Sequence, residues 1–399
     1  MMAELLFLAH RIPFPPDRGD KIRSFHELKH LAGLARVHLG CFADDEGDSA
    51  NLAGLREALG PALGEAHVEV RRGSRVAAAA RALLGGRPVS LALFDSPRLR
   101  AFVERRLETG RIGTIVASSG QMAQFVPAGT RARFVMDFLD VDSAKFEAYA
   151  AAGGVLAPVH RREAAKLAAF ERATAARADV SLFVSEAEAA LFRRRSGLAG
   201  ADIRALQNGV DLNYFAPRPS PEHESPLIVF TGQMDYAPNV DAVRWFAAEV
   251  MPRLGEARFA IVGRNPTEAV RRLAGPRTIV TGAVDDVRGW LAAADVVAAP
   301  LRIARGIQNK VLEAMAMARP VVASPAAFEG IEAEPGRHLL VADGAAAQAG
   351  AIAGLLADPE RARALGRAAR QRMLDNYRWD ARLAPLAELA GLAARRAAA

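Results

Sequence analysis

The order of apolar and amphipathic stretches constrains the fold of this chain most strongly. Short runs of β-branched and other apolar residues alternate with longer stretches of helical periodicity from one end to the other. This alternation is typical of parallel sheets whose crossover helices cover both faces. We predict strands at 4–9, 37–42, 68–71, 113–118, 134–138 and 180–184 in the first half, and at 227–232, 259–262, 278–281, 296–299, 321–323 and 339–341 in the second.

The middle of the chain separates two such blocks. Residues 207–226, QNGVDLNYFAPRPSPEHESP, are rich in Pro, Ser and Asn and show little periodicity, which is typical of a linker. With 399 residues the chain is long enough for two domains. We predict a first domain at 1–213 and a second at 214–376. In such sheets ligands bind beyond the carboxyl ends of the strands, so we expect the chemistry in the loops there.

The composition disfavours several classes of protein. No stretch approaches the roughly 18–20 apolar residues that span a bilayer. The N-terminus has Glu4 where a signal peptide would be positively charged, so we expect a cytoplasmic protein. Cys41 is the only cysteine, which excludes an intrachain disulfide and a cysteine-based zinc site. A nicotinamide oxidoreductase is disfavoured because the sequence contains no Gly-x-Gly-x-x-Gly and no Walker loop.

The net charge of +7 is concentrated in residues 71–111, which hold ten arginines against three acidic residues. Two interpretations stay open. The stretch is either a solvated basic face, or it contacts anionic lipid or a lipid-pyrophosphate acceptor with the help of its apolar neighbours. The stretch lacks the interleaved aromatics of a nucleic-acid module, so we predict no nucleic-acid partner.

Residues 300–325, PLRIARGIQNKVLEAMAMARPVVASP, combine features of a ligand site. They predict a strand end, a loop around Gly306, a helix from near Gln308 and a new strand. Gly306 allows close approach to a ligand, and the N–H groups of the helix start favour an anion. Lys310 in the first turn opposes the helix dipole unless a ligand anion compensates it, and Glu313 can accept hydrogen bonds from sugar hydroxyls. This combination predicts a nucleotide sugar as ligand.

The same stretch resembles the signature of family 4 glycosyltransferases, enzymes of the GT-B fold. That signature has two glutamates with seven residues between them, then Ala-Met-Ala and a Pro-Val-Val strand. Glu313-Ala314-Met315-Ala316 and Pro320-Val321-Val322 match its second half. The resemblance implies an α/β GT-B protein, in which two doubly wound Rossmann-like domains face each other across a cleft and 377–399 cross back to the first domain.

Further segments extend the resemblance over nearly the whole chain. Residues 208–211, Asn-Gly-Val-Asp, are similar to the family's segment between the domains, and we interpret them as a hinge in which Gly209 permits positive φ. Gly-x-Met-Asp-Tyr-x-Pro-Asn at 232–239, PFPPDRGDKIRSFHEL at 13–28 and ARQRMLDNYRWD at 369–380 resemble a bacterial subgroup associated with exopolysaccharide and PEP-CTERM export systems.

The resemblance implies a donor site in the second domain. Glu313 would bind the ribose hydroxyls and Lys310 the pyrophosphate, while backbone amides at 306–308 would stabilise charge on the departing phosphate. We interpret Asn239 as the cap of the following helix. The predicted donor-binding residues are Gly232, Gly282, Val284, Gly306, Ile307, Gln308, Lys310, Glu313 and Glu329.

Arg305 departs from the family pattern, because it occupies the position of the first glutamate. An arginine cannot accept hydrogen bonds from donor hydroxyls. The chain also has Gln233 and Met234 where the family commonly places an Arg and a Lys, so phosphate binding falls to Arg302, Arg305 or Lys310. We hypothesise that Arg305 either replaces the missing phosphate cations or pairs with the carboxylate of an acidic donor sugar. An arginine that points into solvent stays open as well.

Two segments of the first domain contribute candidates by the same resemblance. Residues 10–31 are similar to the loop that passes near the donor phosphates and the acceptor. Asp137 and Asp140 end a predicted strand where the family has a His or an acidic group near the reacting sugar, and crowded carboxylates there call for raised pKa values or a cation. A metal-binding cluster and capping roles stay open. The candidates are Arg18, Gly19, Lys21 and Arg23 in the cleft loop, with Asp137, Asp140 and Arg305 as catalytic residues.

Residues 26–30 satisfy His-Glu-x-x-His on a predicted helix, as a zinc protease would require. No third ligand follows at a recognisable spacing, so we predict no metal site. We predict a retaining glycosyltransferase without a cofactor that moves a sugar from a UDP- or GDP-linked donor to a lipid-linked or saccharide acceptor in exopolysaccharide or cell-surface glycan synthesis. Alternatives are a nucleotide-sugar epimerase of the same fold and a nucleotide-sugar-binding protein with a decayed site. Peripheral contact with the inner face of an anionic membrane would run through 71–111.

Overall fold

The computed structural model describes residues 4–71, 79–80, 82, 84–219, 225–304 and 306–392. The chain divides into two compact units. Unit 1 holds the described residues up to Gln207 and again from Leu383 onward, and unit 2 spans Asn208–Arg382. Arg305 lies outside the described residues, as do parts of the 71–111 stretch.

The centre of unit 1 is a parallel sheet with the strand order β3-β2-β1-β4-β5-β6-β7 in the described residues. The strand order reverses between β1 and β4, as in doubly wound folds. The first strand, Glu4–Ala9, is buried on both faces after Glu4 because helices cover both sides, and these buried residues are accordingly a continuous apolar run. The strands are β1 (Glu4–Ala9), β2 (Arg36–Ala43), β3 (Leu63–Val70), β4 (Ile112–Ser118), β5 (Arg133–Leu139), β6 (Val180–Phe183) and β7 (Ile203–Ala205).

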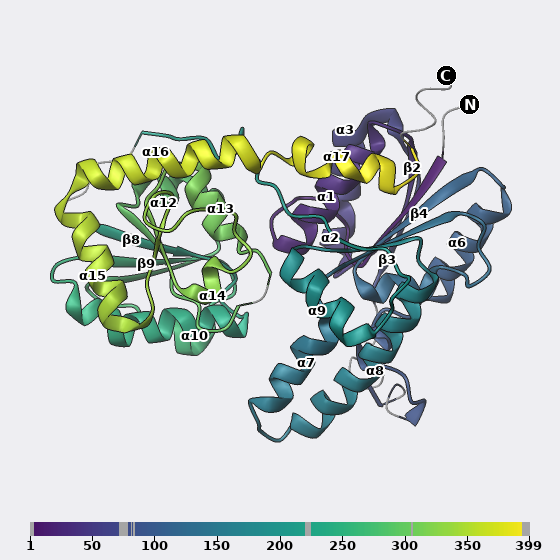
Figure 1. The fold of residues 1–399 in the computed structure, drawn as a ribbon, viewed down its shortest axis with the longest axis horizontal. Coiled ribbons are helices and arrows are strands. Elements are labelled where there is room, and N and C mark those ends of the chain that lie inside the picture. The colour runs from purple at the N-terminus through teal and green to yellow at the C-terminus, as the bar shows by residue number, and fades with distance from the viewer. Residues whose placement is uncertain are drawn as a thin grey trace. The chain divides into compact units, whose positions relative to one another are not determined.

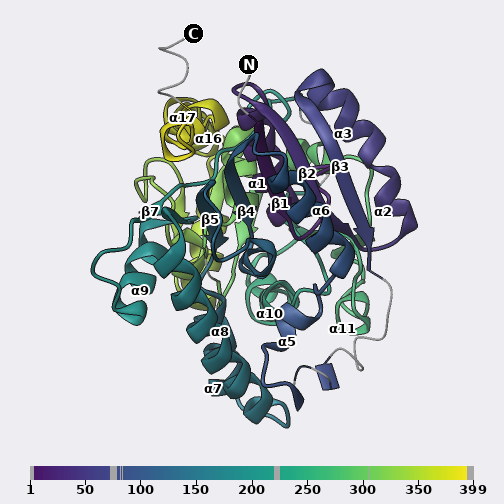
Figure 2. The ribbon, with the colours of Figure 1, turned by 90° about the vertical axis from the view of Figure 1, so that its right-hand side faces the viewer.

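Helices cover both faces of this sheet (Figure 1). After β5 the chain forms α7 and α8, two antiparallel helices that extend as a hairpin away from the sheet (Figures 1 and 2). The described helices are α1 (Gly19–Ala32), α2 (Glu46–Ala50), α3 (Leu52–Leu59), α5 (Val89–Ala92), α6 (Pro97–Glu108), α7 (Asp142–Ala151), α8 (Ala157–Arg177) and α9 (Glu186–Ser196), with short 3₁₀ turns at Gly60–Ala62 and Gly120–Phe125.

Unit 2 is built on a second parallel sheet, with the order β10-β9-β8-β11-β12-β13 in the described part of the chain. Here too the order reverses next to the first strand of the unit, β8, and helices lie on both faces (Figure 1). The strands are β8 (Leu227–Thr231), β9 (Arg258–Val262), β10 (Thr278–Gly282), β11 (Val296–Ala299), β12 (Val321–Ala323) and β13 (Leu340–Val341).

The helices of unit 2 follow these strands in turn. The last of them, α17, begins in unit 2 and ends in unit 1, since the boundary falls at Leu383. The helices are α10 (Ala237–Trp245), continued by a π-helical turn at Phe246–Val250 and a 3₁₀ turn at Met251–Arg253, then α11 (Glu268–Arg271), α12 (Val287–Ala293), α13 (Asn309–Ala316), α14 (Pro325–Phe328), α15 (Gly344–Ala357), α16 (Pro359–Asn376) and α17 (Trp379–Leu389).

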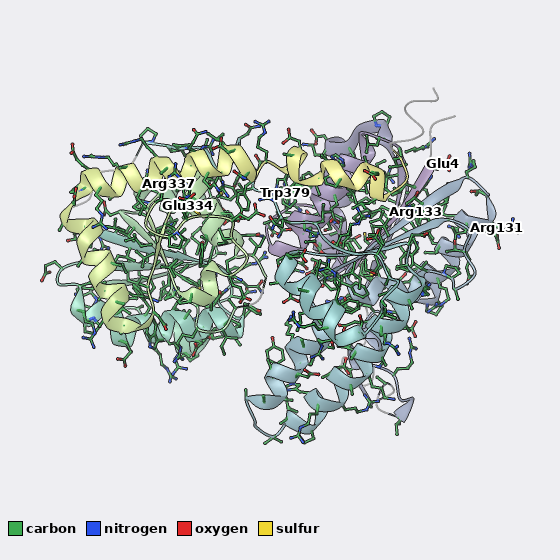
Figure 3. The ribbon with its side chains drawn as sticks, in the orientation of Figure 1. Glu4, Arg131, Arg133, Glu334, Arg337 and Trp379 are labelled. Carbon is green, nitrogen blue, oxygen red and sulfur yellow. The ribbon has the colours of Figure 1, made fainter. Side chains whose placement is uncertain are left out.

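The end of the chain packs on unit 1 through backbone carbonyls. Arg133 Nε donates to Leu389 O at 2.6 Å, and Thr114 Oγ1 donates to Ala390 O at 2.9 Å. Figure 3 labels Arg133 in unit 1 and Trp379 at the start of α17. The predicted fold of two doubly wound sheets with a returning C-terminal helix is confirmed. The three-residue strand β7 was not predicted, because Ile203–Ala205 contains a single residue with a strong strand propensity.

Candidate functional site

The loops that follow the strands of unit 2 gather at one edge of its sheet. Because neighbouring strands are parallel, β8, β9, β10, β11 and β12 all end at this edge. The predicted donor-binding residues follow these strand ends, so the fold brings them to a common edge. They are Gly232, Gly282, Val284, Gly306, Ile307, Gln308, Lys310, Glu313 and Glu329.

Two glycines bring the loops after β8 and β9 into direct contact. The N–H of Gly232 donates to Val262 O at 3.0 Å. A Cβ atom added at Gly263 would lie 1.6 Å from Gly232 O, so no side chain fits there unless the loop moves. A Cβ at Gly232 would lie 2.8 Å from Asn239 Nδ2 and 3.1 Å from Lys310 Nζ. The missing side chains therefore leave bare backbone beside the Lys310 ammonium group.

The Lys310 ammonium is held by an amide and an aromatic ring. Lys310 Nζ donates to Asn239 Oδ1 at 2.6 Å and lies 4.2 Å from the centre of the Phe230 ring. Asn239 Nδ2 in turn donates to Gln233 O at 2.9 Å, which fixes the orientation of the amide. A lysine from α13 therefore reaches the loop after β8, where the sequence itself has Gln233 and Met234 instead of basic residues.

Burial shifts the pKa values of both charged groups of α13 toward neutrality. It lowers the pKa of Lys310 to about 7, although the nearby Glu313 acts in the opposite direction. Burial likewise raises the pKa of Glu313 to about 7, and the charge of Lys310 partly offsets this rise. Strongly perturbed groups at a strand edge are typical of ligand sites, where a bound charge can complete the balance.

The backbone before α13 is shaped by a glycine. Gly306 adopts φ of 66°, a left-handed conformation that disfavours other residues. Gln308 Nε2 donates back to Gly306 O at 3.1 Å, and Ile307 between them is buried. The loop thus reaches the start of α13 in a fixed conformation. The helix start carries N–H groups that favour an anion.

The three predicted phosphate cations are in different situations. Arg302 pairs with Asp241 through two hydrogen bonds, one of 2.9 Å from Nε, and this pair is partly exposed. Lys310 lies against the glycine loop as described. Arg305 lies outside the described residues, so its predicted catalytic role stays a prediction. Among the described cations of this trio, Lys310 is the one at the glycine loops.

The remaining predicted donor residues have simpler surroundings. Gly282 ends β10 with φ of 71°, and Val284 packs partly buried against the core of unit 2. Glu329 is exposed and follows α14. Asn208 Nδ2 approaches Asn309 Oδ1 at 3.4 Å, which links the first residue of unit 2 to the first residue of α13.

In unit 1 the predicted cleft-loop cations are engaged with carboxylates. Arg18 contacts Asp44 at 3.1 Å and Asp20 at 3.2 Å, and Lys21 Nζ donates to Asp48 at 2.6 Å while its side chain is almost fully buried. Gly19 begins α1 and is exposed. Of these residues, Arg18 and Gly19 retain surface exposure.

Arg23 and Asp137 form a fully buried pair, which differs from the expectation that both face a ligand. Arg23 donates to the two carboxylate oxygens of Asp137 at 2.7 and 2.9 Å and to Leu206 O at 2.6 Å. Glu27, the glutamate of the His-Glu-x-x-His motif, lies 3.1 Å from Arg23 and is also fully buried. Burial and the neighbouring Asp137 raise the pKa of Glu27. The cluster joins α1 to the ends of β5 and β7.

Asp140 lies just beyond the end of β5. Burial, together with the charges of Glu188 and Asp142, raises the pKa of Asp140 to about 7. Its Oδ1 is buried and accepts no hydrogen bond from the described residues. Glu188 itself accepts from the N–H of Val141 at 2.8 Å. A carboxyl group that titrates near neutrality can exchange protons with a substrate.

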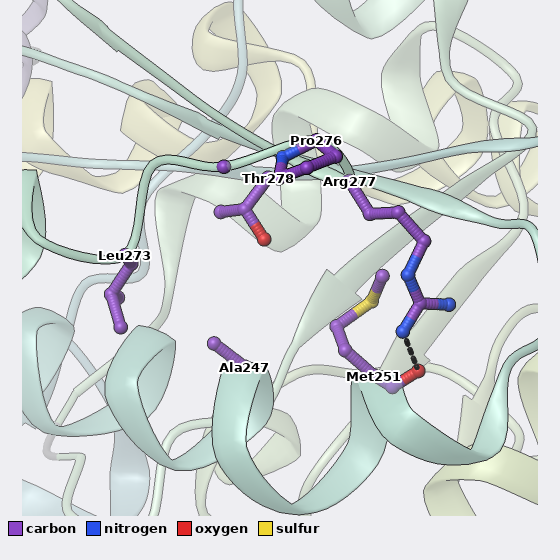
Figure 4. Close-up of a pocket in the computed structure, with 7 residues that line it drawn as sticks. Ala247, Met251, Leu273, Pro276, Arg277 and Thr278 are labelled. Carbon is purple, nitrogen blue, oxygen red and sulfur yellow. Dashed lines mark hydrogen bonds between the residues drawn. The ribbon is translucent and has the colours of Figure 1, made fainter.

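Other surfaces of the described structure are less suited to this chemistry. A hollow of about 300 Å³ lies between Met251, Leu273 and Thr278 (Figure 4). Thr278 begins β10, so this hollow is at the edge of the sheet opposite to the glycine loops. In the described ranges, no group of three or more His, Cys, Asp or Glu side chains is arranged to hold a metal ion. No helix there has the length and apolarity needed to cross a membrane.

Sequence reasoning missed Asn239 and Phe230 as neighbours of Lys310. Asn239 was interpreted as a helix cap, but α10 already begins at Ala237 and the Asn239 amide points to Gln233 and Lys310 instead. The spacing of 71 residues between Asn239 and Lys310 carries no local signal. Their meeting follows from the parallel sheet, which places the β8 and β11 loops side by side.

Comparisons with known proteins give a family match for unit 2 and similar folds for the chain. Residues 225–358, within unit 2, match the family model described as "Glycosyl transferases group 1". No curated protein sequence matches the chain. Solved structures with similar folds cover nearly the whole chain, and at their low identities these likenesses show the fold.

Three of these structures illustrate the likeness. Sucrose-phosphate synthase from Thermosynechococcus elongatus has a TM-score of 0.73 at 18% identity, covering 97% of this chain and 98% of that one. HepE from Anabaena, in complex with UDP and glucose, has a TM-score of 0.67 at 17% identity, covering 97% and 99%. WaaG, a glycosyltransferase involved in lipopolysaccharide biosynthesis, has a TM-score of 0.68 at 16% identity, covering 96% and 99%. The chain therefore has the GT-B fold, its residues 225–358 match the group 1 glycosyl transferases, and together these findings support a glycosyltransferase.

Proposed function

We propose that this protein is a retaining glycosyltransferase that moves a sugar from a nucleotide-diphosphate donor to a lipid-linked or saccharide acceptor. The observation that carries the proposal is the position of Lys310 Nζ, 2.6 Å from Asn239 and against the bare backbone of Gly232. Glu313 lies one helical turn further along α13. A cation beside a glycine loop and a carboxylate one turn away suit the phosphates and the hydroxyls of one ligand.

The site can stabilise the charge that develops when the donor breaks. The bond between the sugar and the phosphate oxygen cleaves, and its electron pair stays on the phosphate. The Lys310 ammonium and the N–H groups at 306–308 would face that charge, and such preorganised donors cost little reorganisation during the reaction. Glu313 would hold the ribose and so keep the phosphate in register with these groups.

In unit 1 we assign different roles to the two predicted aspartates. Asp137 is fully buried and already accepts two hydrogen bonds from Arg23, so it maintains the structure of the strand end. Asp140 has a pKa raised to about 7 and a buried oxygen without a hydrogen bond in the described structure, which suits a group that exchanges a proton with the acceptor hydroxyl. In the predicted cleft loop, Gly19 is exposed and Arg18 is partly exposed.

Two features support a UDP-linked donor and a cell-surface product. HepE was solved with UDP-glucose and WaaG is described as acting in lipopolysaccharide biosynthesis, and both share this fold. The role of Arg305 remains our hypothesis that it pairs with the phosphates or with an acidic sugar. A comparison of UDP-glucose with UDP-glucuronate tests the second version, and equal use of both donors would exclude it.

Membrane contact through 71–111 receives less support from the ion pairs of this stretch. Arg71 pairs with Asp44, Arg87 with Asp95, and Arg106 with Glu4 and Glu65. Arginines that are paired in this way present less free positive charge to a lipid surface. Contact of this stretch with a lipid surface therefore stays a prediction.

Thermal unfolding with a panel of UDP-, GDP- and dTDP-sugars and the free nucleotides tests the proposal. A ligand that binds only the folded protein raises its midpoint according to its affinity. We expect a shift with one base, and its loss in Lys310→Met. No shift with any nucleotide would favour the decayed-site alternative. Turnover of a nucleotide sugar to its epimer without an acceptor would instead favour the epimerase.

A further inference from the structure

The turn between α7 and α8 exposes apolar side chains. Val155 is 96% exposed, Leu156 59% and Val159 39%. Leu84, which lies in a neighbouring segment, is 90% exposed. Single exposed apolar residues need no explanation, but several at one end of a unit mark a surface that contacts something. We call Leu84, Val155, Leu156 and Val159 the hairpin tip.

Both segments of the hairpin tip are held in place. Arg162 donates to Ala82 O and to Arg87 O, each at 3.2 Å, and these two carbonyls flank Leu84. The Glu163 carboxylate accepts from the N–H groups of Val89 and Ser90 at 2.8 Å. The first turns of α8 therefore hold residue 82 and residues 87–90 beside the hairpin, so the tip is a built feature of the fold.

Aromatic rings from α7 and α8 pack against one another within the hairpin. Phe146, Tyr149 and His160 form a cluster with ring centres 5.7 to 5.9 Å apart. Tyr149 and His160 are partly exposed. Rings with an apolar body and a polar edge are favoured at the boundary between a bilayer and water.

The charges around the hairpin tip are of one sign. The sequence contains no Asp or Glu at 148–162 or at 84–94. Arg161 is exposed in the first turns of α8, close to the tip. Of the nearest acidic residues, Glu163 is buried and binds backbone N–H groups as described, and the exposed Glu147 on α7 pairs with Arg195. Apolar side chains with a cation beside them are complementary to an anionic lipid surface, whereas an apolar surface on a protein partner would not select for the cation.

The hairpin tip also lies on the side of unit 1 where β5 ends and Asp140 follows. α7 begins just beyond the end of β5, and its 10 residues lead away from the sheet edge where Asp140 lies. A helix of this length spans about 15 Å. Figures 1 and 2 show the hairpin extending from unit 1 in this way.

We propose that the hairpin tip docks unit 1 on an anionic lipid bilayer. Val155 and Leu156 enter the headgroup region, Arg161 faces the lipid phosphates, and the Asp140 edge is held about 15 Å from the membrane surface. A lipid-linked acceptor presented at that height would suit the proposed function, but docking itself does not depend on any transfer activity.

Co-sedimentation of the full chain with sucrose-loaded vesicles tests the docking. We expect binding to vesicles that contain phosphatidylglycerol, weak binding to pure phosphatidylcholine, and release by salt. Replacing Val155 and Leu156 by Ser removes the apolar anchor and should weaken binding about tenfold. Arg161→Gln should weaken it further, by about fivefold. Phosphate buffer at equal ionic strength should compete no better than chloride, which separates a bilayer surface from a free-phosphate site.

A matched control uses an exposed arginine of unit 2. Arg271→Gln removes the same charge from the end of α11 and should leave vesicle binding unchanged. An unchanged thermal transition of unit 1 in scanning calorimetry would show that each tip variant is folded. Equal binding by the tip variants and the parent would overturn the proposal, as would a lack of binding to any vesicle. A concentration-dependent dimer that Val155→Ser with Leu156→Ser abolishes would also overturn it, in favour of a second copy as occupant.

Discussion

At the scale of single residues, the chain shows how a missing cation can be supplied from another element. The loop after β8 lacks basic residues, and Lys310 from α13 reaches it through Asn239. We expect Asn239→Leu to weaken donor binding by about tenfold, because the ammonium loses a charged hydrogen bond. It should also shift the alkaline limb of the pH profile to lower pH. Calorimetric titration with UDP at several pH values measures both effects, with the exposed Asn213→Leu as control.

The same two groups predict a bell-shaped pH dependence of donor affinity. Burial lowers the pKa of Lys310 to about 7 and raises that of Glu313 to about 7. Above pH 7 the free lysine loses its proton and must regain it on binding an anion, so affinity falls by up to about tenfold per pH unit. Below pH 7 Glu313 gains a proton and loses its function as an acceptor. Lys310→Arg should flatten the alkaline limb and Glu313→Gln the acid limb. A flat profile in the parent protein would contradict this prediction.

The pH dependence of stability has the same origin. The folded pKa of Lys310 lies below its ordinary 10.5, so between about 7 and 10.5 the unfolded chain binds more protons and stability rises with pH. The folded pKa of Glu313 lies above its ordinary 4.5, so between about 4.5 and 7 the folded chain binds more protons and stability falls as pH rises. Lys310 and Glu313 therefore lower the stability of the ligand-free protein most near pH 7. We expect Glu313→Gln to stabilise the ligand-free protein at pH 8 while it weakens donor binding, as is common for functional residues.

At the scale of elements, the sequence predicted strands well and side-chain neighbours less well. Apolar runs such as that of β1 and the amphipathic pattern of α13 depend on local periodicity, which a sequence displays. The role of Gly209 depends instead on a distant contact. It was interpreted as a hinge glycine that permits positive φ, but a Cβ there would lie 2.8 Å from the Trp379 Cα atom, so close packing requires the glycine. Arg23 was similarly expected in a ligand cleft and is buried against Asp137, because β5 brings a carboxylate from 114 positions away.

The buried cluster that joins α1 to β5 and β7 yields a stability prediction. Arg23→Met leaves Asp137 and Glu27 buried without their cation, and we expect a loss of about 3–5 kcal/mol in the free energy of unfolding. Urea denaturation followed by fluorescence measures it. Arg105→Met, which removes an exposed pair with Glu65, should cost less than about 1 kcal/mol. Similar losses of unfolding free energy in Arg23→Met and Arg105→Met would show that the buried cluster stabilises the fold no more than an exposed ion pair does.

At the scale of the whole molecule, the chain passes from unit 1 to unit 2 and back. The return depends on Leu383, Leu386 and Leu389, which are 1%, 0% and 5% exposed. Each buried leucine contributes roughly 1.5–3 kcal/mol. Deletion of the chain from Leu383 onward also leaves Arg133 Nε and Thr114 Oγ1 without the carbonyls that they bind. We therefore expect unit 1 to unfold at a lower temperature in the truncated protein, while unit 2 keeps its own transition.

Scanning calorimetry with and without UDP distinguishes the two transitions, because a donor ligand bound by unit 2 raises only the transition of that unit. The single variant Leu386→Ala should lower the other transition by removing about 2–5 kcal/mol, since Leu386 is fully buried. Ala384→Ser, at an exposed position of α17, should leave it unchanged. If truncation shifted the UDP-sensitive transition instead, the end of the chain would stabilise unit 2, and the donor site would depend on the returning helix.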